Sequence, residues 1–218
     1  MAKKPIAIST STFNLNDLPS DRRFEELLYH IFQYRVKDDL KDTFDSVIQM
    51  PDGREQGRDV LLVKDGKNTG LVQCKKYKGN LGRPEAAKEI LKFVLYYLNE
   101  NKLIHDVPTF QYYLAVSDKF STPAINLLKD FKNEILAATE LQTWTEELIK
   151  KYSTLSGLNF ASIETQLKNT LSLLNIIQIT SSNINSWLNK YEDITHDFFE
   201  VKKVIDDTNI KKVVEILC

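Results

Sequence analysis

The fold is decided by residues 57–77, which read GRDVLLVKDGKNTGLVQCKKY. Two apolar runs, at residues 60–63 and 71–72, lie on either side of the pair Asp65-Gly66. An Asp-Gly pair between two apolar runs is the strongest short-range signal for a β-hairpin, because both residues tolerate the positive φ that a tight loop requires. The stretch therefore predicts two adjacent antiparallel strands joined by a short turn.

The hairpin brings polar residues of its two strands together at the open end. Asp59 stands at the head of the first strand and Gln73 near the end of the second, so we expect the two side chains to lie side by side. Because side chains alternate along a strand, Gln73 and Lys75 project from one face while Cys74 points to the other. The sequence thus predicts that Asp59, Gln73 and Lys75 converge at one edge of the sheet.

These groups suit the hydrolysis of a phosphodiester, which needs a hard cation, a positioned water and charge that stabilises the developing anion. Asp59 offers a carboxylate oxygen for Mg²⁺, Gln73 an amide oxygen and Cys74 its backbone carbonyl, with waters and substrate oxygens completing the octahedron. Lys75 would orient the attacking water and neutralise charge in the transition state. The hairpin therefore predicts a metal-dependent nuclease site.

A helix before the hairpin supplies one more candidate ligand. It is expected to begin near Ser20-Asp21, because both residues are good N-caps and an apolar stripe at helical spacing follows. Glu25 lies on the flank of this stripe and could reach the metal site; the alternative is a first-turn glutamate that complements the helix dipole. Asp52 is a rival carboxylate, but Asp59 is preferred because Asp52 lies outside the apolar strand.

The order of these motifs resembles the Mrr-like branch of the PD-(D/E)xK nuclease superfamily, over roughly residues 24–128. In that branch glutamine often stands where the superfamily has Glu or Asp. Gln73 therefore fits the branch, although a neutral ligand holds a metal less tightly than a carboxylate. The motifs that carry the resemblance are Phe24-Glu25, Gly57-Arg58-Asp59, Val72-Gln73-Cys74-Lys75-Lys76-Tyr77, Ala115-Val116-Ser117 and Phe120-Ser121-Thr122-Pro123-Ala124.

The resemblance implies an α/β fold of the restriction-endonuclease type, with an αβββαβ core and a mixed central sheet flanked by helices. It also implies a Mg²⁺-dependent endonuclease that acts on double-stranded DNA, with Mn²⁺ as a substitute metal and a dimer or higher homo-oligomer as its assembly. The implied metal ligands are Asp59, Gln73, the Cys74 carbonyl and Glu25, and Lys75 completes the catalytic set.

The remaining sequence pattern agrees with this core. It predicts a strand over residues 44–50, an amphipathic helix that opens at Pro84, a buried strand over 111–116, and a helix from about Thr122 to Phe131. A helix continues the αβββαβ order after the last strand. The predicted order of elements is therefore αβββαβα.

We divide the chain into an N-terminal arm at 1–20, a nuclease core at 21–139 and a C-terminal extension at 140–218. The extension carries amphipathic helical patterns and no catalytic motif, so we expect it to serve assembly or to link to a region downstream. Its predicted helices cover residues 141–152, 163–174 and 185–199.

A basic run without acidic residues follows the second hairpin strand. Lys76, Lys78 and Arg83, together with Arg58, are the expected contacts to DNA phosphates. The helix that opens at Pro84 could add its free backbone amides to phosphate binding. The alternative is a solvated charged loop without a ligand.

Composition excludes several other classes of protein. The 218 residues, with 42% apolar content and a net charge of −1, allow a substantial core but no surface that is basic throughout. Two cysteines cannot form a disulfide framework, and no apolar stretch is long enough for a signal peptide or a membrane span, so we expect a cytoplasmic protein. The three histidines are isolated from metal or nucleophile motifs, which argues against zinc and acyl-transfer chemistry.

Mrr-like domains resemble effector modules at the N-terminus of larger proteins, including bacterial antiviral STAND NTPases. By this fold-level analogy we expect an antiphage effector nuclease that is activated by oligomerisation. The chain contains no Walker A pattern, so a regulatory NTPase or sensor would lie outside it. Two alternatives stay open: a nuclease-fold module of weak or no activity that binds nucleic acid or docks a protein, and a standalone type IV-like restriction endonuclease.

Overall fold

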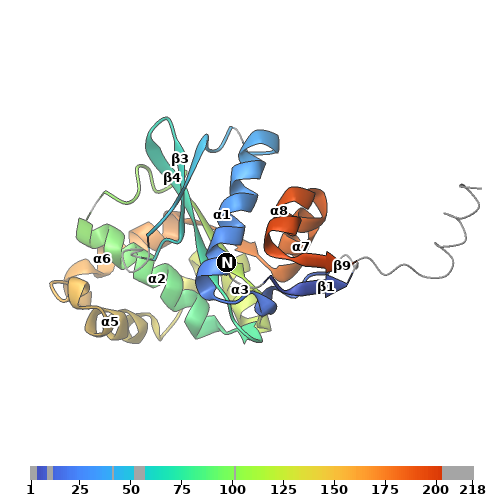
Figure 1. Ribbon diagram of the computed structural model, residues 1–218. Helices are drawn as coiled ribbons and strands as arrows, with labels where there is room; N and C mark the ends of the chain where they lie inside the picture. The colour runs from blue at the N-terminus through green and yellow to red at the C-terminus, as the bar shows by residue number, and fades with distance from the viewer. Residues whose placement is uncertain (1–3, 9–11, 41, 52–56, 101, 203–218) are drawn as a thin grey trace, which may run out of the picture.

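The computed structural model describes residues 4–8, 12–40, 42–51, 57–100 and 102–202 (Figure 1). Its centre is a five-stranded sheet built from β2 (Ser46–Gln49), β3 (Val60–Lys64), β4 (Lys67–Lys75), β6 (Gln111–Val116) and β8 (Asn175–Ile179). The strand order is β2-β3-β4-β6-β8. The first three strands are antiparallel to one another, whereas β4, β6 and β8 run parallel. The predicted α/β fold with a mixed central sheet is confirmed.

The β3–β4 hairpin forms at the predicted loop. Asp65 and Gly66 have φ angles of 50° and 72°, the positive values that a two-residue loop between twisted strands requires. The register of the two strands shifts between Val63 and Leu62. Beyond this shift, toward the open end of the hairpin, Val60 lies opposite Val72. The turn and this register shift together determine which residues meet at the open end of the hairpin.

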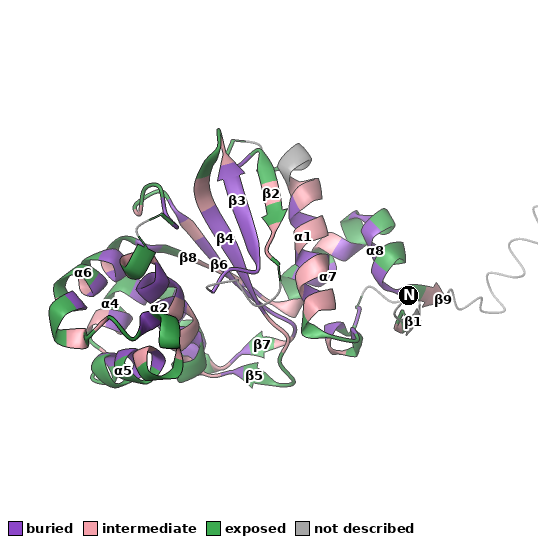
Figure 2. Cartoon of the chain, turned by 60° about the vertical axis from the view of Figure 1, so that its left-hand side comes forward, coloured by how far each residue is buried: buried purple, intermediate pink, exposed green. Residues whose placement is uncertain are grey.

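One face of the sheet is covered by α1 (Asp21–Asp38), with α7 (Ser181–Lys190) and α8 (Glu192–Phe198) on the same side (Figure 2). α1 begins at the predicted position, where the Ser20 hydroxyl accepts a hydrogen bond from the Arg23 backbone N–H at 3.0 Å. Its apolar stripe packs on the sheet and on α7. This cluster includes Phe24, Leu28, Phe32, Val60, Val72, Cys74, Ile184 and Leu188.

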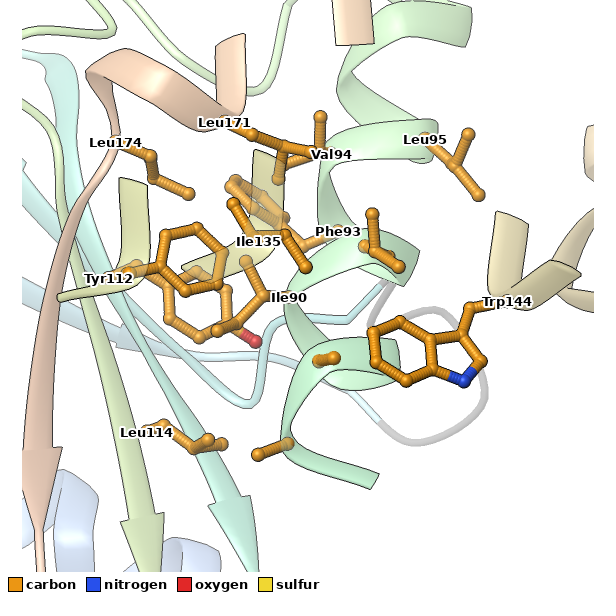
Figure 3. Close-up of a cluster of buried hydrophobic side chains, with 14 of the residues drawn as sticks. Ile90, Phe93, Val94, Leu95, Tyr112, Leu114, Ile135, Trp144, Leu171 and Leu174 are labelled. Carbon is orange, nitrogen blue, oxygen red and sulfur yellow. The ribbon is translucent and has the colours of Figure 1, made fainter. Parts of the chain in front are cut away.

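The opposite face is covered by α2 (Arg83–Glu100), with α4 (Phe131–Leu136), α5 (Leu141–Lys151) and α6 (Phe160–Leu173) around it (Figure 2). The buried side chains of α3 (Thr122–Lys129) belong to the same core cluster as those of α2. Figure 3 shows Ile90, Phe93 and Val94 of α2 beside Tyr112 of β6. The Phe93 ring stacks on Phe110 with centroids 5.6 Å apart, and both side chains are fully buried. This packing fixes α2 against the sheet.

Several smaller elements lie outside the central sheet and its helices, and one pair of them joins the two ends of the described chain. β1 (Ile6–Ile8) pairs in parallel with β9 (Glu200–Lys202), and β5 (Asn80–Leu81) pairs in parallel with β7 (Lys119–Phe120). Short 3-10 helices cover Leu15–Asp17 and Ser153–Leu155. The sequence predicted none of these elements, because each is only two or three residues long.

The predicted order αβββαβα is confirmed from α1 to α3, but the later chain differs from the prediction. Residues 175–179, inside the extension predicted as helical, form β8 beside β6. A short apolar run directly after a helix cannot be assigned by periodicity alone. The single helix predicted over 185–199 is divided at Tyr191 into α7 and α8. The extension therefore contributes a strand to the sheet and helices to both faces.

Candidate active site

The open end of the β3–β4 hairpin holds Asp59 and Gln73 in direct contact. Gln73 Nε2 donates a hydrogen bond to Asp59 Oδ2 at 2.6 Å, and the Cys74 backbone N–H donates to the same oxygen at 2.5 Å. The Asp59 backbone N–H donates in turn to the Val72 carbonyl at 3.2 Å. The pair that the sequence predicts is thus brought together by the register of the hairpin.

Asp59 is only 5% exposed, and its surroundings oppose its negative charge. Burial raises the pKa of the Asp59 carboxyl from its ordinary value of 3.8 to about 7; the charge of Glu25 also raises it, whereas the hydrogen bond from Cys74 and the charges of Lys75 and Lys92 lower it. Near neutral pH the carboxyl is therefore divided between its neutral and charged forms. A bound cation would favour the charged form.

Gln73 supplies a second buried oxygen. The residue is 3% exposed, and its Oε1 accepts no hydrogen bond from the described residues. An unpaired buried acceptor costs about 1–3 kcal/mol, so this oxygen suits a ligand. Carboxylate and amide oxygens are hard donors of the kind that Mg²⁺ takes, and the donor set fits that ion. Within the described ranges, His, Cys, Asp and Glu side chains form no group of three or more that could hold a metal.

The Cys74 side chain points to the other face, into the cluster under α1. Its thiol is almost fully enclosed, and burial, together with the charge of Asp59, raises the pKa of that thiol well above its ordinary value. The side chain is therefore a small buried hydrophobe. What Cys74 offers the site is its backbone.

Lys75 leaves the same face of β4 as Gln73 and reaches α2. Its Nζ lies 2.8 Å from Glu89 Oε1, and the other carboxylate oxygen, Glu89 Oε2, lies 2.9 Å from Lys92 Nζ. Burial alone would raise the pKa of the Glu89 carboxyl, but the charges of Lys92 and Lys75 outweigh it and hold that pKa below its ordinary value. The predicted catalytic lysine is therefore ion-paired to a carboxylate that the sequence analysis did not single out.

Glu25 lies on α1, and its negative charge helps to raise the pKa of the Asp59 carboxyl. Its Oε2 lies 3.0 Å from Arg22 Nη1, and the same nitrogen donates to the Met50 carbonyl at 2.7 Å. Since the Met50 backbone N–H donates to the Asp59 carbonyl at 2.9 Å, Arg22 connects α1 to the strand beside Asp59. Glu25 thus lies near the site, and its role as a metal ligand stays a prediction.

The loop before Asp59 touches α2 at Gly57. This glycine has a φ of 78°, and a Cβ added to it would lie 3.1 Å from Lys92 Cε and 3.3 Å from Phe93 Cα. Both the backbone conformation and the close approach require glycine. The rival carboxylate Asp52, in the preceding loop, lies outside the described residues.

We expect Gly57→Ala to lower the free energy of unfolding by about 2–3 kcal/mol. Left-handed backbone costs about 1–2 kcal/mol in a residue with a Cβ, and crowding against the Phe93 backbone adds to it. Gly66→Ala is the matched control, because Gly66 has a similar φ of 72° with no heavy atom within 4 Å of an added Cβ. Urea denaturation of both variants measures the difference, and equal losses would contradict close packing of this loop on α2.

Two of the four predicted phosphate contacts, Arg58 and Arg83, interact with other parts of the protein. Arg58 is 8% exposed, and burial lowers the pKa of its guanidinium while the charge of Glu100 raises it. Its enclosed side chain does not fit the prediction of a surface contact to DNA. Arg83 Nη1 lies 3.2 Å from Glu140 Oε1, and the guanidinium lies 5.4 Å from the centre of the Trp144 ring. Arg83 therefore helps to join α2 to α5.

Lys76 and Lys78 follow β4 directly. Lys76 is half-buried and Lys78 exposed, and Tyr77 between them is 45% exposed. The Tyr77 backbone N–H donates to Ser117 Oγ at 2.9 Å, which holds this segment next to the end of β6. Two lysines on either side of an exposed aromatic ring suit contact with a nucleic acid, and their role as phosphate contacts stays a prediction.

Three polar residues of this region, two half-buried and one buried, were not predicted from the sequence. Glu89 and Lys92 form a charged pair at helical spacing on the face of α2 that meets β4, and charge on the flank of an apolar stripe was the signal that could have found them. Tyr112 is fully buried, and burial raises the pKa of its hydroxyl well above its ordinary value, with further contributions from the charges of Glu89 and Asp59. Its hydroxyl therefore lies close to this site.

None of the described helices has the length and apolar character needed to cross a membrane.

A family model with the description "Restriction endonuclease", Mrr_cat, matches residues 19–101. Comparisons with curated proteins and with solved structures gave no match. The matched segment contains Glu25, Asp59, Gln73 and Lys75 and ends before β6, so the motifs at residues 115–117 and 120–124 lie outside it. Residues 19–101 of this chain are therefore an Mrr-like restriction endonuclease domain of the PD-(D/E)xK type.

Proposed function

We propose that this protein is a Mg²⁺-dependent DNA endonuclease whose active site is the Asp59–Gln73 pair with Lys75. The observation that carries the proposal is the buried Asp59 carboxyl, with its raised pKa, in contact with an amide whose oxygen has no hydrogen-bond partner among the described residues. A folded protein has little reason to bury such a pair without a ligand, because both groups lose solvation. The family match supports a nuclease as the setting for this pair.

Each residue has a role that follows from its chemistry. Asp59, Gln73 and the Cys74 carbonyl would hold Mg²⁺, with Glu25 contributing from α1, and Mn²⁺ could replace it. The bound ion would supply Lewis-acid stabilisation of the phosphate oxygens. Lys75 would orient the attacking water and neutralise the developing negative charge in a partly desolvated site. Gln73 presents its amide nitrogen to Asp59 in this structure. Rotating the amide by half a turn would place its oxygen on the side of Asp59, where a cation bound to Asp59 would accept it as a ligand.

The wider role is part of the same proposal. Lys76 and Lys78 would hold the phosphates of double-stranded DNA beside the site, through a contact that weakens with salt. We propose that the domain is the effector of an antiphage defence protein, that it acts as a homo-oligomer, and that a regulatory NTPase or sensor region controls it. The family match gives the nuclease setting, and the defence role rests on fold-level analogy.

We expect the wild-type chain to cleave supercoiled plasmid with Mg²⁺, and Asp59→Asn to reduce the rate at least hundredfold, because the metal loses its anionic ligand. The measurement is the cleavage rate across protein concentrations that reach self-association, with Mn²⁺ in a parallel series. Asp59→Asn is preferred to alanine because it keeps an acceptor for the hydrogen bonds from Gln73 and Cys74.

The matched control is Asp42→Asn, which changes an exposed aspartate away from the site and should cleave like wild type. Undiminished cleavage by Asp59→Asn would contradict the assignment of the active site. Absence of cleavage at every concentration, together with absence of Mg²⁺ binding that depends on Asp59, would instead favour a module for nucleic-acid binding or protein docking.

A further inference from the structure

We infer that Glu89 of α2 is a positioning residue that holds the Lys75 ammonium at the edge of the Asp59–Gln73 pair. The inference rests on the proposed function, because it assigns a purpose to Lys75 in cleavage. It adds to the hairpin motif a residue from a different element, 14 positions after Lys75 in the chain. The contact that carries it is the 2.8 Å ion pair between Lys75 Nζ and Glu89 Oε1.

Lys75 needs such a partner for a physical reason. A lysine ammonium is a compact charge on a flexible four-carbon chain, and fixing that chain in one position costs rotamer entropy. The side chain is 28% exposed, so packing alone does not enclose it. A carboxylate in a fixed place selects one position of the ammonium from the many that the side chain can reach. A displacement of about 1 Å at a reacting centre can cost on the order of a hundredfold in rate.

Glu89 is itself held in place by a second ion pair and by the packing of its helix on the sheet. Its side chain is 19% exposed, and its second carboxylate oxygen lies 2.9 Å from Lys92, whose side chain is 14% exposed. Its neighbour on the helix, Ile90, is fully buried in the core between α2 and the sheet. The Glu89 carboxylate therefore stays in one position, and the Lys75 ammonium forms its ion pair there. This is the geometry of a support for a catalytic group.

The same contacts separate Glu89 from the metal ligands. Each of its two carboxylate oxygens faces a lysine, one from β4 and one from its own helix. The two ammonium groups exceed its single charge, so the cluster as a whole stays positive beside Asp59, and Lys75 and Lys92 both lower the pKa of Asp59. We assign Glu89 to the lysine and not to the metal.

The test is Glu89→Gln in the full chain, which keeps the shape of the side chain and removes its charge. We expect kcat for plasmid cleavage to fall about tenfold to a hundredfold, with KM for DNA and the Mg²⁺ concentration for half-maximal rate unchanged. Glu147→Gln is the matched control. Glu147 pairs with Lys88, the neighbour of Glu89 on α2, at 2.6 Å and is 55% exposed, so its loss should leave cleavage unchanged.

A structural effect is separated from positioning by two further variants. Glu89→Gln leaves the half-buried Lys92 without its carboxylate, so Glu89→Gln/Lys92→Met is included as a form without the Lys92 charge, and its kcat should fall as much as that of Glu89→Gln. Under single-turnover conditions with excess enzyme, Glu89→Gln should cause no further loss in a Lys75→Ala background, because its effect passes through Lys75. An equal loss in both backgrounds, an unchanged kcat, or a higher Mg²⁺ requirement would each overturn the inference.

A measurement without catalysis keeps this inference distinct from the proposed function. Reductive methylation followed by mass spectrometry reports how accessible each lysine amine is. Lys75 should react more slowly than exposed Lys78 in wild type, and faster in Glu89→Gln than in wild type. Equal rates at Lys75 in both proteins would overturn the hold of Glu89 on Lys75, whereas failure of wild type to cleave DNA would overturn the proposed function.

Discussion

At pH 8 the metal-free Asp59→Asn variant is expected to be more stable than wild type by about 4 kcal/mol. The raised pKa of Asp59 means that the folded protein at this pH carries a buried carboxylate that its surroundings disfavour. The difference between about 7 and the ordinary value of 3.8 corresponds to about 1.4 kcal/mol for each unit. Asparagine removes this cost and keeps an oxygen that can accept the hydrogen bonds from Gln73 and Cys74.

The dependence on pH has a definite sign. Between pH 4 and pH 7 the folded wild-type chain binds a proton at Asp59 that the unfolded chain has lost, so its stability falls as the pH rises through this window. The gain from Asp59→Asn should therefore be small near pH 4, grow up to about pH 7 and then stay constant. Urea denaturation at several pH values in the presence of a chelator measures it. A gain that does not change with pH would contradict the raised pKa of Asp59.

Phe93→Ala is expected to cost about 3–5 kcal/mol, the usual loss for a large aromatic side chain removed from a packed core. Phe93 is fully buried, with its ring centre 5.6 Å from Phe110 and 5.5 Å from Tyr112. Its backbone is also the surface on which Gly57 rests. The variant should therefore loosen the contact between α2 and the loop that leads to Asp59, as well as lower the melting temperature.

Thermal and urea denaturation measure the loss, and Tyr77→Ala is the control. Tyr77 is an aromatic residue with 45% of its surface exposed, so its truncation should change the free energy of unfolding by no more than about 0.5 kcal/mol. A Phe93→Ala variant as stable as Tyr77→Ala would show that the core between α2 and β6 is not packed as described.

The hairpin could be predicted because its signals are local. The loop Asp65-Gly66 determines the turn, and the turn together with the register shift between Val63 and Leu62 places Asp59 beside Gln73. The beginning of α1 is equally local, since the Ser20 hydroxyl and the backbone it caps are three residues apart. Such features depend on neighbours in the chain, and a single sequence contains them in full.

The rest depends on which elements meet, and this is not visible in one sequence. Helical spacing indicated which side of α2 is apolar, but it could not show that Glu89 reaches Lys75 of β4. Arg58 stands next to Asp59 in a motif that suggests an exposed basic residue, yet the folded chain encloses it. The run of residues 175–179 has the same pattern as the end of a buried helix, and only its partner β6 makes it a strand.

The position of β8 in the sheet has a consequence for how the chain is made. Synthesis runs from the N-terminus, so β6 emerges from the ribosome about sixty residues before its neighbour β8. Until residue 179 has been added, one edge of β6 is an unpaired row of backbone amides and carbonyls on an almost wholly apolar strand, which can template aggregation. The nascent chain thus carries an unpaired apolar strand edge during translation, and only β8, which is synthesised later, pairs with it.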